Sequence, residues 1–356
     1  MRILHILYSF GCGGAERFVA DLSNAQHAAG HDVSVCIIRP ANPGSTFCTR
    51  FLDDEIPFAS LDITSGITIR KMAKVKRYID AAQPDIVHCH HNVMPYVCFA
   101  ALSGSGKFIH TIHSEGFRAA GGRADRLISK FLYRALKVVP VAISDVCADS
   151  FNEVFGMKPT IIVNGRSVDK NTDRLQSVRD FINGTKRDEN TVVFLHVARF
   201  HEVKNQNALF EAFTILEKRG VNCSLIVLGD GFEASGLLDN LPDNVHYVGA
   251  VANVADYLAC CDAFCLSSFS EGLPISLLEA LSFGLTSVCT PVGGMKDVIL
   301  DGKTGYLSSG VSSEEFAVAL ERAYTGLIDK DVIMRYYLEN FSIESCSSKY
   351  MDIYEA

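Results

Sequence analysis

Two glutamates eight residues apart are the clearest candidates for chemistry in this sequence. Glu271 and Glu279 stand in the segment SSFSEGLPISLLEALSFG, in which Pro274 is expected to begin a helix and Gly284 to end it. A helical rise over eight residues would separate the two carboxylates by about 12 Å. Paired-carboxylate hydrolases need about 5–9.5 Å. The spacing therefore favours two carboxylates that bind hydroxyl groups at opposite ends of an elongated ligand.

The loop after the first of these glutamates supplies further candidates. The backbone amides of Gly272 and Leu273 precede the predicted helix and would offer hydrogen-bond donors between the two carboxylates. In the alternative interpretation, Glu271 only stabilises the helix dipole and Glu279 pairs with a surface lysine. The residue types alone leave both interpretations open.

Two cations follow a strand predicted at residues 191–198. Arg199 and Lys204 stand in RFHEVKN, directly after the apolar run TVVFLHVA. Positive charges at the end of a buried strand are costly unless they meet an anion. A guanidinium and an ammonium together suit a diphosphate. The alternative is a surface pair whose charge is balanced by Glu202.

A glycine-rich turn separates the first predicted strand, residues 1–8, from a helix expected at 15–30. Gly13 and Gly14 in GCGGAER would let the backbone approach a ligand closely, and the amides at a helix start favour a phosphate. The turn matches neither the GxGxxG dinucleotide pattern nor a Walker loop. It is equally consistent with a tight strand–helix turn that Glu16 caps.

Histidines gather after two other predicted strands. His113 follows a strand at 108–112, a position that suits a ligand contact as well as a buried histidine with satisfied hydrogen bonds. Strand alternation places His88 and His90, at the end of a strand at 85–89, on one face. No carboxylate or cysteine pair stands nearby in the sequence to complete a metal site, so no metal is expected.

The elements that must position these residues alternate between strands and helices. Apolar, β-branched runs predict strands at 1–8, 33–38, 85–89, 108–112 and 138–144, and again at 191–198, 224–229, 245–248, 263–267 and 286–290. Such alternation predicts an α/β protein with parallel sheets covered by helices on both faces. In open sheets of this kind, ligands bind beyond the carboxyl ends of the strands, where the candidate residues stand.

At 356 residues, the chain is too long for one ordinary core and fits two domains. We expect the first domain at 1–165 and the second at 191–341. The polar, charged segment 166–190 is predicted to be the linker between them. The tail at 342–356 is helix-like and is expected to pack back towards the first domain.

The net charge of −8 is unevenly distributed along the chain. Residues 1–165 carry 17 Lys and Arg against 14 Asp and Glu, whereas the remaining residues carry 16 against 27. Cations recur at helical spacing in two predicted helices, at Arg70, Lys74 and Arg77 and at Arg126, Lys130, Arg134 and Lys137. Such basic faces are typical of helices that rest on anionic lipid headgroups, and equally of ordinary solvated helices.

The composition excludes several classes of protein. A content of 48% hydrophobic residues excludes a disordered chain. No apolar run approaches the roughly 18 residues of a membrane span. The charged pair Glu16-Arg17 soon after the first apolar run argues against a signal peptide. Twelve scattered cysteines without a CxxC pair predict free thiols in a reducing cytoplasm.

Together, these motifs resemble the retaining GT-B glycosyltransferases of family 4. The resemblance rests on GGAER, RFHEVKN, LIVLGDGFE, YVGAVANVADYL, the E-x7-E segment and GGMKDVILDGKTGYL, which occur in this order over nearly the whole chain. It implies a GT-B fold, in which two Rossmann-like parallel-sheet domains face one another across a cleft. The first domain would bind the acceptor and the second a nucleotide sugar.

The resemblance also implies roles for the candidate residues. Gly13 and Gly14, with Arg199 and Lys204, would bind the diphosphate of the donor. Glu271 would hold the hydroxyls of the donor sugar, with the Gly272 and Leu273 amides beside it, and Glu279 would hold the ribose. His113 would face the reacting sugar, so that Glu271, His113, Arg199 and Lys204 form the expected catalytic set.

The expected activity is metal-independent transfer of a hexosyl or N-acetylhexosaminyl group in bacterial surface polysaccharide synthesis. The donor is expected to be a UDP-sugar, ahead of a GDP-sugar, and the acceptor a glycan or a polyprenyl-diphosphate-linked glycan. The protein is expected in the cytoplasm, peripheral on the inner face of the membrane, without a nucleic-acid partner or a cofactor. Two alternatives remain open, a nucleotide-sugar-binding subunit without catalysis and a nucleotide-sugar epimerase of the same fold.

Overall fold

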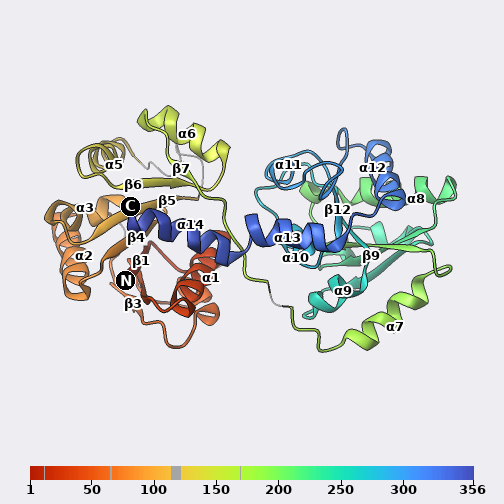
Figure 1. The fold of residues 1–356 in the computed structure, drawn as a ribbon, viewed down its shortest axis with the longest axis horizontal. Helices are drawn as coiled ribbons and strands as arrows, with labels where there is room; N and C mark the ends of the chain where they lie inside the picture. Colours follow the sequence, from red (N-terminus) through yellow and green to blue (C-terminus); the bar gives the residue numbers. More distant parts are fainter. Residues whose placement is uncertain (12, 65, 114–121, 169) are drawn as a thin grey trace. The chain divides into compact units, whose positions relative to one another are not determined.

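The computed structural model describes residues 1–11, 13–64, 66–113, 122–168 and 170–356, which form two compact units (Figure 1). Unit 1 contains Met1–Ser167 and Asn340–Ala356, and unit 2 contains Val168–Glu339. The chain therefore leaves unit 1, completes unit 2 and returns to unit 1. Cys12 of the glycine turn and residues 114–121 lie outside the described residues.

Unit 1 is built on a sheet of seven parallel strands in the order β3-β2-β1-β4-β5-β6-β7. The strands are β1 Arg2–Leu7, β2 Asp32–Ile37, β3 Phe58–Ser60, β4 Ile86–His90, β5 Lys107–Ile112, β6 Val139–Ala142 and β7 Thr160–Ile161. The helices are α1 Gly14–Ala28, α2 Ile69–Ala82, α3 Met94–Ser103, α5 Arg123–Ala135, α6 Asp145–Phe155 and α14 Ile343–Glu355, with the short 3-10 helix η1 Phe47–Phe51.

Alternation along the central strands gives unit 1 an apolar core on each face of its sheet. On β1, Leu4 and Ile6 face the core that contains α2, α3, α5 and α6. Ile3 and Leu7 face the core that contains α1 and α14, which lie side by side in Figure 1. His5 lies between Ile3 and Leu7, so it shares the face covered by α1 and α14.

Unit 2 has a six-stranded parallel sheet in the order β10-β9-β8-β11-β12-β13. The strands are β8 Val192–Val197, β9 Cys223–Leu228, β10 Val245–Gly249, β11 Ala263–Leu266, β12 Thr286–Cys289 and β13 Gly305–Leu307. The α-helices are α7 Leu175–Thr185, α8 Gln206–Lys218, α9 Val254–Cys260, α10 Ile275–Ser282, α11 Met295–Val298, α12 Ser313–Thr325 and α13 Lys330–Asn340, and the 3-10 helices are η2 Glu202–Lys204, η3 Phe232–Ala234 and η4 Leu237–Asn240. One core joins β8, β9 and β11 to α8 and α12.

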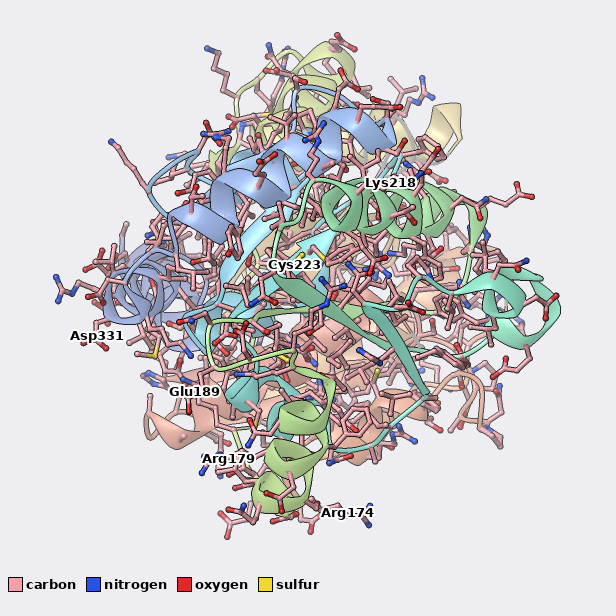
Figure 2. The ribbon with its side chains drawn as sticks, turned by 90° about the vertical axis from the view of Figure 1, so that its right-hand side faces the viewer. Arg174, Arg179, Glu189, Lys218, Cys223 and Asp331 are labelled. Atoms are coloured by element: carbon pink, nitrogen blue, oxygen red, sulfur yellow. The ribbon has the colours of Figure 1, made fainter. Side chains whose placement is uncertain are left out.

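The boundary between the units differs from the sequence prediction. The segment 166–190, predicted to be a linker, contains α7, and the change from unit 1 to unit 2 lies at Ser167–Val168. Val178 and Ile182 are buried, because an apolar stripe four residues apart makes this otherwise polar segment an amphipathic helix. Figure 2 shows α7 as a regular helix that carries the labelled Arg179.

The C-terminal residues complete the core of unit 1. Helix α14, which spans most of the tail at 342–356, buries Tyr350 and Tyr354 beside α1. No helix among the described residues is both long and apolar enough to cross a membrane. All eleven described cysteines are free thiols, ten of them buried as small core residues.

Candidate functional site

Two predicted site residues of unit 2, Lys204 and Glu271, form an ion pair. Lys204 ends η2, after β8, and Glu271 lies in the loop between β11 and α10. Lys204 Nζ lies 2.5 Å from Glu271 Oε1, and the Ser268 hydroxyl donates to the same oxygen at 2.6 Å. The other oxygen, Oε2, has no hydrogen-bond partner in the part of the chain that the structure describes. It can therefore accept a hydrogen bond from a ligand.

This pairing corrects one interpretation of the sequence, in which Glu202 would balance the charge. The partner of Lys204 is Glu271, 67 residues further along the chain. The side chains of Lys204 and Glu271 are only 24% and 10% exposed. Water therefore screens this pair less than it screens a surface pair. A diphosphate that reaches Lys204 meets a lysine that already has a counter-charge.

Hydrogen bonds other than the ion pair hold the two loops together. Asn205 Nδ2 donates to the Ser267 carbonyl at 3.1 Å, and the Ser267 hydroxyl donates to the Lys204 carbonyl at 3.0 Å. The Phe269 amide donates to the Val203 carbonyl at 2.8 Å. Asn205 and Ser267 are both buried. The relative positions of Lys204 and Glu271 are thus fixed by their backbones as well as by their charges.

A pair of glycines on the loop after β12 permits close packing against the Glu271 loop. The Gly294 amide donates to the Gly272 carbonyl at 2.8 Å. A Cβ at Gly293 would lie 1.7 Å from the Glu271 carbonyl oxygen, and Gly293 has a φ of +51°. Neither Gly293 nor Gly294 is among the predicted site residues, although a Gly-Gly pair in the loop after a strand is the signal that marks such a close approach.

The loop that follows Glu271 presents unpaired backbone donors. Gly272 is exposed and Leu273 is half-buried. Neither amide has a hydrogen-bond partner among the described residues. Both amides are therefore able to donate to an anion or a hydroxyl oxygen.

Glu279 lies in α10, at its fifth residue, and its side chain is half-buried. Pro274 is the N-cap of this helix and not its first residue, so the helix begins at Ile275. Only the second half of the segment from Glu271 to Glu279 is helical. The separation of about 12 Å, which assumes a helical rise over all eight residues, therefore does not apply.

Arg199 follows β8 and its side chain is exposed. Its backbone is held in place, because Gln206 Nε2 donates to the Arg199 carbonyl at 3.0 Å. The guanidinium has no ion-pair partner among the residues that the structure describes. Unlike Lys204, Arg199 is therefore a positive group without a counter-charge in unit 2.

A buried histidine on β8 interacts electrostatically with both members of the ion pair. His196 Nδ1 donates to the Cys265 carbonyl at 3.0 Å, and its Nε2 is buried with no hydrogen-bond partner among the described residues. Burial lowers the pKa of His196 to about 4; the hydrogen bond to Cys265 and the charge of Glu271 oppose this shift, and the Lys204 charge contributes to it. His196 is not among the predicted residues, although a lone polar residue within the apolar run TVVFLHVA is the signal for it.

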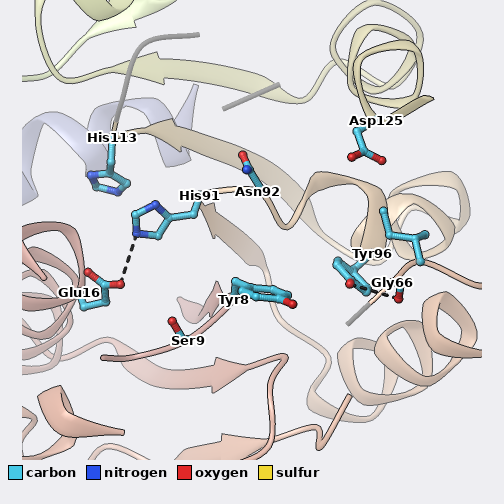
Figure 3. A pocket seen from close by; sticks show the side chains of 10 residues that line it. Tyr8, Ser9, Glu16, Gly66, His91, Asn92, Tyr96, His113 and Asp125 are labelled. Atoms are coloured by element: carbon cyan, nitrogen blue, oxygen red, sulfur yellow. Dashed lines mark hydrogen bonds and ion pairs between the residues drawn. The ribbon is translucent and has the colours of Figure 1, made fainter. Parts of the chain in front are cut away.

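Unit 1 has a cavity of about 600 Å³ next to the carboxyl ends of β1, β4 and β5 (Figure 3). Its polar lining includes Tyr8, Glu16, His91, Tyr96, His113 and Asp125. The described lining contains two carboxylates and no Lys or Arg. This cavity is therefore suited to hydroxyl groups and unsuited to phosphates.

The predicted phosphate-binding turn begins α1 and is bordered by a carboxylate. Gly13 is the N-cap and Gly14 the first helical residue. A Cβ at Gly13 would lie 2.2 Å from Glu16 Oε2, whereas one at Gly14 would have open space around it. Glu16 Oε1 also lies 3.8 Å from His91 Nε2, as Figure 3 shows. Because the Glu16 carboxylate stands beside the helix start, a phosphate at Gly13 would have to displace it.

His113 directly follows β5 and lines the cavity of unit 1. Its Nε2 lies 3.1 Å from His90 Nδ1. Its Nδ1 is buried and has no hydrogen-bond partner among the described residues. Burial lowers the pKa of His113 well below its usual value, and the neighbouring His91 and His110 add to this effect. His113 is therefore a neutral imidazole at pH 7.

His88 and His90 share one face of β4 and meet His5 of β1. The ring centroids of His88 and His90 are 4.1 Å apart, and those of His5 and His88 5.0 Å. One ligand atom from each of the three lies within 4.8 Å of the others, which is close enough to hold a metal ion. Every ring nitrogen of the three already has a hydrogen-bond partner, however. A metal ion would have to replace these hydrogen bonds.

The two predicted basic helices of unit 1 also expose apolar side chains. On α5, Leu127 is 71% and Phe131 48% exposed, and Lys130 and Arg134 are exposed on the same helix. On α2, Ile69 is 74% exposed. These helices therefore combine cations with apolar groups that are open to solvent.

Two family models match the chain, one in each half. The model described as "Glycosyltransferase Family 4" matches residues 12–170, and "Glycosyl transferases group 1" matches residues 177–337. Together, they cover most of the chain and every strand of the two sheets except β1.

Proteins similar to this chain include bacterial glycosyltransferases. A phosphatidyl-myo-inositol mannosyltransferase of Mycobacterium tuberculosis is 24% identical over 343 residues, which are 93% of this chain and 88% of the relative. A UDP-Gal:alpha-D-GlcNAc-diphosphoundecaprenol alpha-1,3-galactosyltransferase of Escherichia coli is 27% identical over 280 residues, 73% of this chain and 70% of the relative. The crystal structure of Anabaena HepE in complex with UDP covers all of both chains, with a TM-score of 0.75 and 17% identity.

Proposed function

Because the chain belongs to the group 1 and family 4 glycosyltransferases and has their GT-B fold, we propose that it is a retaining enzyme of bacterial surface polysaccharide synthesis. It moves a hexosyl or N-acetylhexosaminyl group from a nucleotide sugar to a glycan or lipid-linked glycan. The observation that carries the proposal is the Lys204–Glu271 pair, which is held on two interlocked loops beside two unpaired amides.

In this proposal, unit 2 binds the diphosphate of the donor through fixed positive groups. Arg199 contributes an exposed guanidinium without a counter-charge. Lys204 has three donors, of which Glu271 takes one, so two remain for phosphate oxygens. The donor is a UDP-sugar, ahead of a GDP-sugar. The HepE structure with UDP supports a uridine nucleotide, and the E. coli relative is named for a UDP-sugar.

Glu271 binds the hydroxyls of the donor sugar through its unoccupied Oε2. The Lys204 ammonium and the Ser268 hydroxyl hold Oε1 and so fix the plane of the carboxylate. The Gly272 and Leu273 amides donate to oxygen atoms of the same ligand. Glu279, further along the segment, binds the ribose. A preorganised carboxylate of this kind discriminates between sugars by the positions of their hydroxyls.

Transfer breaks the bond between the anomeric carbon and a diphosphate oxygen. The sugar ring approaches an oxocarbenium ion while negative charge grows on the leaving diphosphate. Arg199 and Lys204 stabilise that charge electrostatically, which is the task that a divalent cation has in other transferases. The acceptor oxygen forms the new bond on the face that the diphosphate leaves, and its proton passes to a diphosphate oxygen. The configuration of the anomeric carbon is therefore retained.

The cavity of unit 1 is proposed to bind sugar hydroxyls, with His113 in contact with the reacting sugar. Its carboxylates and neutral imidazoles suit hydroxyl donors. The Gly13–Gly14 turn keeps its proposed role as a phosphate contact on the condition that Glu16 moves away. Replacing Glu16 with Gln would then strengthen nucleotide-sugar binding, and weaker binding would contradict this role for the turn.

The basic helices α2 and α5 are proposed to contact the inner face of the cell membrane, where a polyprenyl-diphosphate-linked acceptor would be presented. Exposed cations attract anionic headgroups, and exposed side chains such as Leu127, Phe131 and Ile69 supply apolar area. The relatives from M. tuberculosis and E. coli are both named for acceptors with lipid parts.

The proposal is tested first by ligand binding. A thermal-shift panel of UDP-, GDP-, ADP- and dTDP-sugars should show stabilisation by one class, because a ligand that binds only the folded chain raises its Tm. Replacing Glu271 with Gln keeps the shape of the side chain and removes its charge. We expect the E271Q protein to fold, to bind the donor more weakly and to transfer sugar about 10²–10³-fold more slowly.

The product then decides the reaction class. NMR of the transferred sugar should show the same anomeric configuration as the donor, and an inverted configuration would rule out the retaining mechanism. Donor binding without any turnover, tested over a range of glycan and lipid-linked acceptors, would favour a subunit that binds nucleotide sugar without catalysis. An epimerised nucleotide sugar released without transfer would favour an epimerase.

A further inference from the structure

A continuous chain of buried hydrogen bonds runs from α1 to the cavity of unit 1. Gln26 Oε1 lies 2.8 Å from His5 Nε2, His5 Nδ1 lies 3.0 Å from His90 Nε2, and His90 Nδ1 lies 3.1 Å from His113 Nε2. Gln26, His5 and His90 have no exposed surface, and His113 lines the cavity. One helix, the strands β1 and β4 and the residue that follows β5 thus contribute to one polar row.

Each hydrogen bond of this row determines which ring nitrogen of the next histidine carries the proton. The Gln26 Oε1 is a carbonyl oxygen, which only accepts, so His5 carries its proton on Nε2. Burial lowers the pKa of His5 to about 4, so its Nδ1 is bare at pH 7 and accepts from His90 Nε2–H. By the same argument, His90 Nδ1 accepts from His113 Nε2–H. His113 is then left with an unprotonated Nδ1.

The direction in which the hydrogen bonds of this row are donated is set by the amide of Gln26, which α14 orients. Gln26 Nε2 donates to the Tyr354 hydroxyl at 3.2 Å, and that hydroxyl lies 2.6 Å from His88 Nδ1. A hydroxyl that accepts from the amide has its proton available for His88. His88 in turn donates from Nε2 to the Thr111 hydroxyl at 2.7 Å. This second branch therefore agrees with the placement of the Gln26 carbonyl against His5.

We propose that Gln26, His5 and His90 are positioning residues that hold His113 as the Nε2–H tautomer, so that its Nδ1 offers a lone pair to a hydroxyl in the cavity. This inference deepens the proposed function and rests on it for the identity of the hydroxyl. The ligand class is a neutral polyol, because Glu16 and Asp125 add carboxylates to the lining while the described lining contributes no cation.

The test is the tautomer of His113 in the ligand-free full-length chain. Ring-15N-labelled histidine and long-range 1H–15N correlations distinguish a protonated from a bare ring nitrogen, and the signals are assigned by their loss in H113Q, H90Q and H5Q variants. We expect Nε2–H tautomers at His5, His90 and His113 in the wild-type protein at pH 7. A proton on His113 Nδ1 would overturn the inference.

A matched pair of variants separates positioning from simple packing. Replacing Gln26 with Met keeps the shape of the side chain but removes its carbonyl, so His113 should become a mixture of tautomers. Tyr133→Phe removes a comparable buried hydrogen bond, to His110 at 2.6 Å, outside the row. We expect kcat/KM to fall about tenfold in Q26M, consistent with the loss of about one hydrogen bond, and to stay unchanged in Y133F.

The outcomes distinguish this inference from the proposed function. An unchanged His113 tautomer in Q26M would overturn the positioning role, and so would metal-type shifts of His5, His88 and His90 when Zn²⁺ alone is titrated into the wild-type protein at stoichiometric amounts. If the wild-type protein transfers no sugar, the proposed function fails while the tautomer of His113 still decides the positioning role. If Q26M does not fold, the tautomer of His113 in the wild-type protein alone decides whether the inference holds.

Discussion

The two units share a parallel-sheet topology but place opposite kinds of polar group at the ends of their central strands. Unit 2 uses a charged pair, Lys204 and Glu271, on loops held by further hydrogen bonds. Unit 1 uses a row of neutral imidazoles and holds eight of the eleven histidines of the chain. Charged groups suit a charged ligand part such as a diphosphate, and neutral acceptors suit hydroxyls.

The difference also sets what each unit tolerates. A partly buried ion pair is costly to break by removing one partner, because the other charge is left without compensation. A buried imidazole is tolerated while it stays neutral and hydrogen-bonded. Unit 2 should therefore be sensitive to single charge changes, and unit 1 to the pH. The following experiments separate these two sensitivities.

Acid should produce the largest effect, and unit 1 should lose its structure before unit 2. Burial lowers the pKa of both His5 and His110 to about 4, against about 6.5 in an unfolded chain. Between these values the unfolded state binds more protons, so stability falls as the pH falls, by on the order of 3 kcal/mol for each histidine. Among the described histidines of unit 2, only His196 is fully buried.

Hydrogen exchange read by mass spectrometry measures this difference directly. Peptides from β4 and β5 should lose protection between pH 6.5 and 4, while peptides from β8 and β11 keep theirs to a lower pH. Loss of protection in both units at one pH would show that the histidines do not set the acid sensitivity.

The next largest effect is expected from removal of the Lys204 charge. Lys204→Met leaves the Glu271 carboxylate partly buried without its cation and takes one positive group from the proposed diphosphate site. We expect kcat to fall by roughly 10²–10³-fold. Lys218→Met, at the exposed end of α8 (Figure 2), removes the same charge from the same unit as a control. Equal losses in both variants would mean that only the net charge matters.

A smaller effect is expected from a methyl group at Gly293. Gly293→Ala strains a backbone at φ +51° and pushes against the Glu271 carbonyl, at a cost of about 1–3 kcal/mol. Donor affinity should fall about tenfold or more, because the Glu271 loop must move. Gly302→Ala also has a positive φ, +73°, but no atom within 4 Å of the new Cβ. It should lower Tm without changing donor Kd, measured by titration calorimetry.

The smallest effect concerns the exposed apolar face of α5. Phe131→Ser removes a half-exposed ring beside basic residues, and binding to anionic phospholipid vesicles should weaken about fivefold. Val318→Ser on α12 of unit 2 changes a side chain of similar exposure and should leave vesicle binding unchanged. Flotation of the protein with vesicles measures both. Undiminished binding of the Phe131 variant would remove α5 from the membrane contact.

The longer strands could be predicted from the sequence, because a buried parallel strand consists mostly of consecutive apolar residues. The edge strands β3, β7 and β13 could not be predicted, because they have only two or three residues and do not form an apolar run. Helix α7 could not be predicted from the sequence for a different reason. Its stripe of Val178 and Ile182 is too sparse to stand out in a charged segment. Period and hydrophobicity therefore locate central elements better than peripheral ones.

For the candidate site, the residue types could be predicted but not their partners. The side chain that pairs with Lys204 lies 67 residues away, and His5 meets His90 across 85 residues. No local spacing encodes such contacts, because the order of strands in the sheet creates them. His88 and His90 were placed on one face correctly, since strand alternation is local.

The position of helix α14 has a consequence for co-translational folding. Tyr350 bonds to Thr111, and Tyr354 bonds to Gln26, so the sheet of unit 1 is completed by residues that are synthesised only after unit 2. The segment 168–339 has all of its own contacts before those residues emerge. The nascent chain therefore completes unit 2 before unit 1, and truncation before residue 343 would leave the histidine row of unit 1 without the helix that covers it.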